Sequence, residues 1–173
     1  EDGGLAMLER ERGSFRRWPL NRANPHAPYD VWSIAQTRDG ALWVGTFGKG
    51  LYRLEVGTGH MMHWRRTDDS MGLLDDNITD LLEDRSGRLW VATTSGVSVF
   101  ELKDGRYRIL RNLMQNSLAV ALVEDASGQV WIGTRGGVYS VRNEADALPV
   151  PYSLPVPQPV VKGITVDNHG NKW

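Results

Sequence analysis

Short runs of β-branched and aromatic residues alternate with glycine-containing turns along most of the chain. Between residues 77 and 111, "ITDLLED" ends in the turn "EDRSG", "RLWVATT" follows, and "SG" leads into "VSVFEL". The dipeptide Asp104-Gly105 suits a two-residue hairpin loop, after which "RYRIL" completes a fourth run. No segment keeps the i, i+3, i+4, i+7 apolar spacing of an amphipathic helix over ten residues. The pattern predicts antiparallel units of four short strands and no helix.

The same unit recurs along the chain. Its second run reads "GALWVGT" at 40–46, "GRLWVAT" at 87–93 and "GQVWIGT" at 128–134, and "GNKW" at 170–173 begins it again. The tryptophans in these runs are 47, 41 and 42 residues apart. An interval of about forty residues is typical of repeat architectures, and a four-stranded unit at that interval is typical of a β-propeller. The predicted fold class is all-β, a propeller segment of four-stranded antiparallel blades.

The phase of the repeat predicts where the blades begin and end. Strands three and four of a half blade fall at 1–20, and strands one and two of another fall at 159–173. Full blades are expected at 30–66, 77–111 and 117–154. Because the repeat pattern would continue past Trp173, we expect the chain to be part of a larger ring. The alternative is that the two halves join into a fourth blade.

The tryptophans are expected to pack blade against blade. The second strand of a blade is covered on both faces, so it reads as almost continuous apolar sequence. Side chains alternate along a strand, so Leu89 and Val91 should face one neighbour, and Trp90 and Ala92 the other. A large residue beside a small one lets one sheet interlock with the next. This reading favours packing over ligand stacking for the repeat tryptophans.

Composition and charge exclude several classes of function. The chain has 173 residues, 40% of them hydrophobic, a formal net charge of −1 and no cysteine. Disulfides and thiolate metal sites are therefore excluded, and the charge balance gives no indication of nucleic-acid binding. No apolar run reaches the ~20 residues of a transmembrane helix, so membrane attachment is expected only through segments outside this chain. We also expect no cofactor.

The repeat resembles that of the two-component regulator propeller family. "DRSGRLWVAT…GVSVF", "DASGQVWIGT…GVYSV" and "RDGALWVGT…GLYRL" carry the resemblance, and "DNHGNKW" shares part of it. The sequence departs from the family pattern at Thr37, where the turn aspartate is absent, and at Lys172, where an apolar residue is usual. The resemblance implies a seven-bladed, non-catalytic sensor in the periplasmic input domain of a histidine kinase, hybrid regulator or diguanylate cyclase. Glycans or other nutrients are the ligands it implies.

Candidate catalytic and metal-binding residues are few. His60 and His63 are expected on opposite faces of a strand, so a shared metal is not expected. Asp84, Asp125 and Asp167 each precede a turn glycine by three residues and are expected to cap that turn. Two alternatives remain open: a propeller enzyme resembling streptogramin lyases, which needs an acid or base at the channel mouth, and a purely structural scaffold.

Variation in loop length indicates a recognition face. The connections between the fourth strand of one blade and the first of the next differ in length, and the loop "TFGKG" is one residue longer than its counterparts. Both kinds of loop lie on one face of a propeller, where binding residues concentrate. An aromatic surface with cations and amides suits an oligosaccharide or other small molecule. The candidate ligand-binding residues are Tyr29, Trp32, Phe47, Lys49, Asp76, Asn77, Thr94 and Arg135. Association between copies of the chain is also expected, because a partial ring leaves blade faces open.

Overall fold

The computed structural model describes residues 5–20, 30–69, 71–142, 147–154 and 160–173. Within these residues there are fourteen strands and no helix, which confirms the all-β prediction. The chain begins with an antiparallel hairpin of β1 (Leu5–Glu9) and β2 (Ser14–Trp18). No helix in the described part of the chain is long and apolar enough to cross a membrane.

Three four-stranded antiparallel sheets follow, each a meander in chain order. The first contains β3 (Val31–Gln36), β4 (Leu42–Thr46), β5 (Leu51–Leu54) and β6 (Met61–Trp64). The second contains β7 (Ile78–Glu83), β8 (Leu89–Thr93), β9 (Gly96–Lys103) and β10 (Arg106–Leu113). The third contains β11 (Ala119–Glu124), β12 (Val130–Thr134), β13 (Gly137–Val141) and β14 (Val150–Tyr152).

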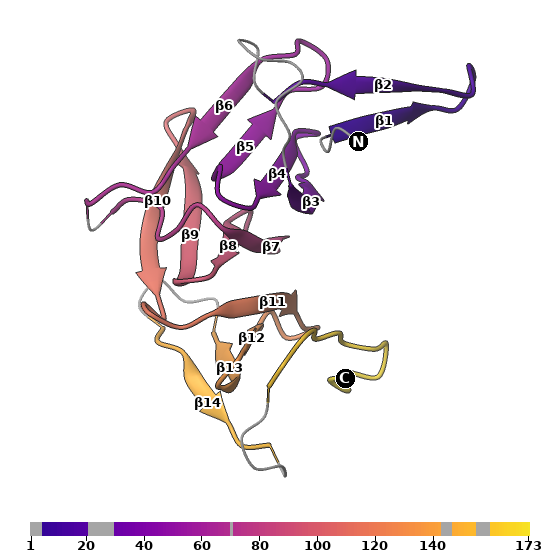
Figure 1. Cartoon of the computed structure of the whole chain (residues 1–173). Helices are drawn as coiled ribbons and strands as arrows, with labels where there is room; N and C mark the ends of the chain where they lie inside the picture. The colour runs from indigo at the N-terminus through magenta and orange to yellow at the C-terminus, as the bar shows by residue number, and fades with distance from the viewer. Residues whose placement is uncertain (1–4, 21–29, 70, 143–146, 155–159) are drawn as a thin grey trace.

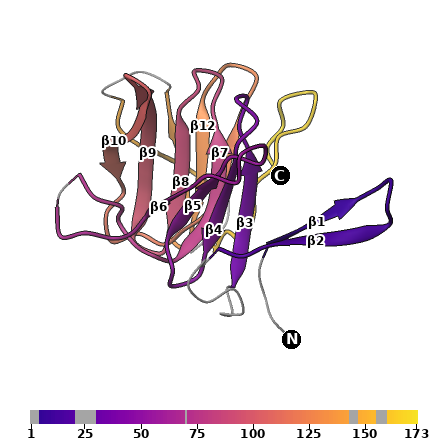
Figure 2. The same ribbon diagram turned by 90° about the horizontal axis from the view of Figure 1, so that it is seen from above.

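The sheets fan out face to face, with β3, β7 and β11 on the inner side and β6, β10 and β14 outside (Figure 1). Figure 2 shows the β1–β2 hairpin projecting away from the three sheets. Because the strand at the inner edge of every sheet is the first of its meander, these strands form one concave wall. That wall is the part of the fold that positions the candidate site.

Trp43 and Trp90 pack between neighbouring sheets, as predicted, whereas Trp173 is 74% exposed and does not. Trp90 and Trp43 are fully buried. Trp90 and Ala92 belong to the core shared with the third sheet, whereas Leu89 and Val91 pack with Trp43 of the first sheet. The two faces of β8 are therefore buried against different neighbours, which explains its uninterrupted apolar sequence.

Small residues on the second strands admit side chains from the next blade. A Cβ atom at Gly45 would lie 2.5 Å from Cγ2 of Ile78, which starts β7. One at Gly133 would lie 2.6 Å from Cγ1 of Val161. Real Cβ atoms do not approach carbon this closely, so the glycines set how near consecutive blades can pack.

The turn aspartates bind more than their own turns. Asp84 accepts backbone hydrogen bonds from Ser86 and Arg88 with one carboxylate oxygen, and its other oxygen accepts the indole N–H of Trp90 at 2.8 Å. The same indole bond joins Trp131 to Asp125 at 2.8 Å and Trp173 to Asp167 at 3.0 Å. Hydrogen bonds from the Asn171 side chain and from the Trp173 indole lower the pKa of Asp167 to about 2. The aspartate therefore ties its turn to the packing tryptophan of the same repeat.

The first repeat lacks this bond because it carries Thr37 in place of the aspartate. The buried indole nitrogen of Trp43 has no hydrogen-bond partner among the described residues. The hydroxyl of Thr37 instead donates to Asp39 at 2.6 Å. The departure from the repeat pattern at residue 37 thus removes one specific hydrogen bond and leaves the strands in place.

Residues 160–173 form a shorter structure than the two strands expected there. Thr165 and Trp173 exchange backbone hydrogen bonds of 3.0 and 2.9 Å, and Val166 forms an isolated bridge with Lys172. Lys172 lies over the ring of Trp131, 4.7 Å from the ring centroid, and its amine is 3.5 Å from Asp125.

Candidate binding site at the channel mouth

A β-bulge interrupts the inner strand of every sheet at the same place. The pairing register shifts between Val31 and Ser33, which leaves Trp32 without a partner in the ladder. Thr79 and Val120 are the unpaired residues at the corresponding breaks in β7 and β11. Bulges redirect side chains and are common beside functional sites. Each of these residues lies eleven positions before its repeat tryptophan, and Lys162 holds that position before Trp173.

A second set of equivalent residues follows the second strand of each sheet. The backbone N–H of Phe47 donates to the carbonyl of Asp30 at 2.8 Å. Thr94 binds the Asn77 carbonyl and Arg135 binds the Leu118 carbonyl in the same way, at 3.2 and 3.3 Å. The loop after strand two is therefore fixed to the start of strand one in each blade. This confirms that the two kinds of connection lie on one face.

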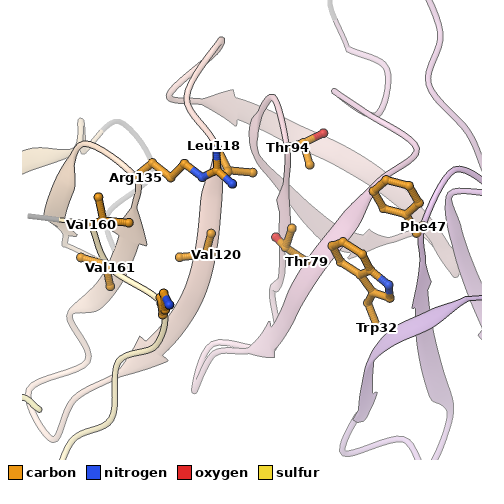
Figure 3. A pocket seen from close by; sticks show the side chains of 10 residues that line it. Trp32, Phe47, Thr79, Thr94, Leu118, Val120, Arg135, Val160 and Val161 are labelled. Carbon is orange, nitrogen blue, oxygen red and sulfur yellow. The ribbon is translucent and has the colours of Figure 1, made fainter.

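Both sets meet at an open cleft of about 590 Å³. Its volume is within the range of small-molecule sites. Figure 3 shows Trp32 and Phe47 on one side, Val160 and Val161 on the other, and Thr79 and Thr94 between them. The lining residues come from the inner strands, the loops that cap them and the segment after β14; they are Trp32, Phe47, Thr79, Thr94, Leu118, Val120, Arg135, Val160, Val161 and Lys162.

An aromatic pair forms one wall. The rings of Trp32 and Phe47 are stacked, with centroids 4.5 Å apart and planes 23° from parallel. Trp32 is 55% exposed and Phe47 is 44% exposed, whereas Trp43 and Trp90 are fully buried. An exposed, stacked pair from two different segments presents a flat apolar surface to solvent, as ligand-stacking sites do.

Some polar side chains of the cleft are hydrogen-bonded within the protein and others are not. The Thr79 hydroxyl donates to the carbonyl of Ala119 at 2.7 Å, and the Thr94 hydroxyl accepts a long 3.4 Å bond from Asn77. Arg135 and Lys162 have exposed side chains, and neither forms a side-chain hydrogen bond or ion pair with the described residues. The polar side chains of the cleft that remain available to a ligand are therefore two cations.

Four of the eight candidate residues from the sequence line this cleft: Trp32, Phe47, Thr94 and Arg135. Asn77 is adjacent, with its amide bound to Asp75 at 2.9 Å and to Thr94. Asp76 is paired with Arg65 at 2.5 Å, and Lys49 is exposed outside the lining. Tyr29 lies outside the described residues, as does most of the connection at 19–30. The role of these residues in binding stays a prediction.

Sequence reasoning missed Thr79, Val120 and Lys162, although the repeat itself marks them. They occupy the same position of the repeat as Trp32. Aligning the repeats on their tryptophans would therefore have identified them once Trp32 was chosen as a candidate. Leu118, Val160 and Val161 are apolar residues at the start of an inner strand or of its counterpart. Nothing in their type distinguishes them from core residues.

No acid–base pair is present at the cleft among the described residues. His63 stacks on Tyr52 with centroids 4.0 Å apart, and its Nε2 is 2.6 Å from the Lys49 carbonyl oxygen. Asp80 follows the bulge at Thr79; burial raises its pKa, and its carboxylate accepts the backbone N–H of Leu122 at 2.8 Å. It therefore joins β7 to β11 and does not line the cleft. The described residues also include no cluster of acidic and histidine side chains suited to a metal.

Comparison with known proteins identifies the repeat. The profile of the family described as two component regulator propeller matches residues 27–48, 72–95 and 112–136. Each match covers the first two strands of one four-stranded sheet, the second of which carries the repeat tryptophan. No curated protein sequence matches the chain significantly.

Several solved structures share the fold. The extracellular domain of BT4673 from B. thetaiotaomicron, described as a one-component system, has a TM-score of 0.74 and 21% identity over 99% of this chain. Virginiamycin B lyase from Staphylococcus aureus has a TM-score of 0.70 and 11% identity over 97% of it, and 54% of the lyase is covered. PorZ, a surface component of the type-IX secretion system of Porphyromonas gingivalis, has a TM-score of 0.69 and 18% identity over 99% of this chain and 28% of PorZ.

At these identities the likeness shows the fold alone, and this chain spans only 23% of the BT4673 domain. The predicted fold class, an all-β propeller segment of four-stranded blades, is confirmed. The repeated turn and tryptophan pattern, the blades that it builds and the matching profile lead to one conclusion: this chain contains three copies of the two-component regulator propeller repeat.

Proposed function

We propose that the chain is a non-catalytic recognition module that binds a small molecule at the mouth of the propeller channel. The observation that carries the proposal is the cleft itself. Its wall residues occupy equivalent positions of successive repeats, yet they are of different chemical types: Trp32, Thr79, Val120 and Lys162 in one set. The frame around them repeats the same tryptophan in every copy. A uniform frame with a varied concave surface is typical of repeat proteins that recognise ligands.

The proposed setting is the extracytoplasmic part of a bacterial signalling receptor. The family description names two-component regulators, and the similar BT4673 structure is of an extracellular domain. Both support an input role upstream of a signalling output. Fusing alkaline phosphatase, which is active only outside the cytoplasm, to the complete gene product would test this placement. Activity of the fusion is expected, and an inactive but stable fusion would contradict it.

Ligand binding is tested by calorimetry on the full chain with a panel of oligosaccharides and small organic acids. We expect a ligand whose affinity falls at least about tenfold in Phe47→Ala, because the mutation removes half of a stacked pair. Phe15→Ala is the matched control, since Phe15 is exposed on the β1–β2 hairpin away from the cleft. Equal binding by the Phe47 variant and the parent would place the site elsewhere.

The enzymatic alternative makes a separate prediction. Quinupristin is the ligand in one structure of a catalytically inactive virginiamycin B lyase. Because no described histidine lines the cleft, we expect quinupristin to be recovered unchanged, as judged by mass spectrometry, after incubation with the full chain. Its conversion would overturn the non-catalytic proposal.

A further inference from the structure

The side chains of Arg135 and Lys162 line the cleft and have no anionic partner among the described residues. Two other arginines of the chain are paired with acids: Arg53 binds Asp39 at 2.7 Å, and Arg108 binds Glu101 at 2.6 Å. Neither Arg135 nor Lys162 forms a side-chain hydrogen bond or ion pair with the described residues, yet both line the cleft. Two unpaired cations on one concave surface create a local positive potential that attracts an anion.

These cations stand in register with the aromatic wall. Arg135 occupies in the third sheet the position that Phe47 occupies in the first. Lys162 occupies, in the segment after β14, the position of Trp32. The two cations therefore occupy the same positions of the repeat as the two aromatic residues, but at the other end of the series of blades. Figure 3 shows the Arg135 side chain extending over Leu118 toward the middle of the cleft, with the aromatic pair beyond.

The surface between these two ends offers few groups for a polyhydroxylated ligand. Leu118, Val120, Val160 and Val161 are apolar. The hydroxyl of Thr79 is already bound to a backbone carbonyl, and that of Thr94 already accepts a bond from Asn77. Each hydroxyl of a neutral sugar that loses water needs a new partner, or its desolvation opposes binding. A neutral sugar is thus less well matched to the cleft than a ligand with one charged group.

Resting on the proposed binding function, we propose that this cleft binds a small anionic molecule that carries a flat apolar ring. The ring stacks on Trp32 and Phe47 and covers the valines. The carboxylate, or an equivalent anion, binds Arg135 and Lys162. This assigns Lys162 to the site and makes charge, together with ring stacking, the basis of specificity.

The test compares 2-naphthoate with 2-naphthamide, which share the ring and differ in charge. Calorimetry with the full chain is expected to show the carboxylate binding at least about tenfold more tightly. Arg135→Gln and Lys162→Gln should each reduce that preference, because each removes one of the two positive charges that the carboxylate binds. Lys103→Gln, at the exposed end of β9, is the control for loss of one positive charge. Raising the salt concentration should also reduce the preference, because these cations are exposed.

Three outcomes separate this proposal from the general binding function. Equal affinities for the two probes, or an unchanged preference in both glutamine variants, overturns the anionic assignment. If a neutral oligosaccharide then binds in a manner that depends on Phe47, the binding function stands without it. If neither probe binds and no member of the calorimetric panel binds, both proposals fail. Circular dichroism of each variant checks that its fold is unchanged.

Discussion

At the scale of single residues, the hydrogen bond between a turn aspartate and the indole of its repeat tryptophan recurs along this chain. Asp84, Asp125 and Asp167 each accept an indole N–H from six residues ahead. A buried carboxylate is costly unless its oxygens are satisfied, and the turn amides and the indole together satisfy both of them. The sequence predicted the turn cap correctly. It did not predict the indole bond, because a donor six residues away is outside the reach of local turn chemistry.

Replacing the indole by a phenyl ring separates packing from hydrogen bonding. Trp90→Phe and Trp43→Phe lose the same volume at fully buried sites, but only Trp90→Phe leaves a buried carboxylate oxygen without its donor. We expect Trp90→Phe to cost about 1–3 kcal/mol more than Trp43→Phe in the free energy of unfolding. Urea denaturation of both variants measures the difference. Equal costs would show that the indole bond adds nothing to packing.

Protonation of Asp39 should account for part of the loss of stability of the fold at low pH. Burial opposes its ionisation, but hydrogen bonds from Thr37 and Arg53 outweigh burial and lower the pKa of Asp39 from 3.8 to about 2. A carboxyl whose pKa is lowered by folding stabilises the fold above its unfolded pKa, and that stabilisation disappears as the pH falls toward the folded value. Between about pH 4 and pH 2, the parent should therefore lose more stability than Asp39→Asn. Parallel pH dependences of the two proteins would contradict this.

At the scale of elements, arginines in the first turns connect consecutive blades. Arg38 donates to the carbonyl of Arg85 at 3.0 Å, and Arg85 donates to the carbonyl of Ala126 at 2.7 Å. Their backbone amides bind Glu83 and Glu124 of the next blade, each at 2.9 Å. Ala126 stands where a third arginine would continue the series. At that joint, Lys172 contacts the preceding blade instead, through the ring of Trp131.

Removing one of these arginines should loosen one joint. Arg85→Ala is expected to destabilise the fold by about 1 kcal/mol, since its exposed guanidinium loses one hydrogen bond to Ala126 and a 3.9 Å ion pair with Glu124. Hydrogen exchange should increase in the turns of the second and third sheets and remain unchanged in the first. Arg106→Ala, an exposed arginine on β10, is the control. Uniform acceleration across all three sheets would show that the blades do not respond separately.

The strands were predictable from sequence and the bulges were not. Alternation of side chains and the turn glycines indicate where each strand runs, since both act locally. A bulge adds one residue without changing that composition, so Thr79 and Val120 look like ordinary strand residues. Trp32 and Phe47 were found because exposed aromatics stand out at loop boundaries. Lys162 was missed because its position has meaning only in the register of the complete repeat.

At the scale of the whole molecule, the β1–β2 hairpin exposes apolar residues beyond the three sheets. Phe15 is 71% exposed, and Leu8 and Met7 are exposed as well. Only the base of the hairpin, through Leu5 and Trp18, packs with the first sheet. A two-stranded element with free edges and an apolar surface favours association.

We therefore expect copies of this 173-residue chain to associate as concentration rises. The double variant Leu8→Ser/Phe15→Ser should associate more weakly, because it removes apolar area from the hairpin. Leu102→Ser, on the outer part of β9, is the control for loss of an exposed apolar side chain. Sedimentation equilibrium measures all three proteins. A parent that stays monomeric at high concentration would contradict the expectation.

The bulge also separates the residues that maintain the repeated fold from the residues that can differ between blades. A bulge residue forms no pair in the ladder, so exchanging its side chain removes no hydrogen bond between paired strands. The copies within this chain already differ there, with tryptophan, threonine, valine and lysine at one position, while the packing tryptophan is the same in each. Duplicated blades can thus diverge in recognition while the pairing of their strands is kept. A new specificity would require changes at a handful of sites that take no part in strand pairing.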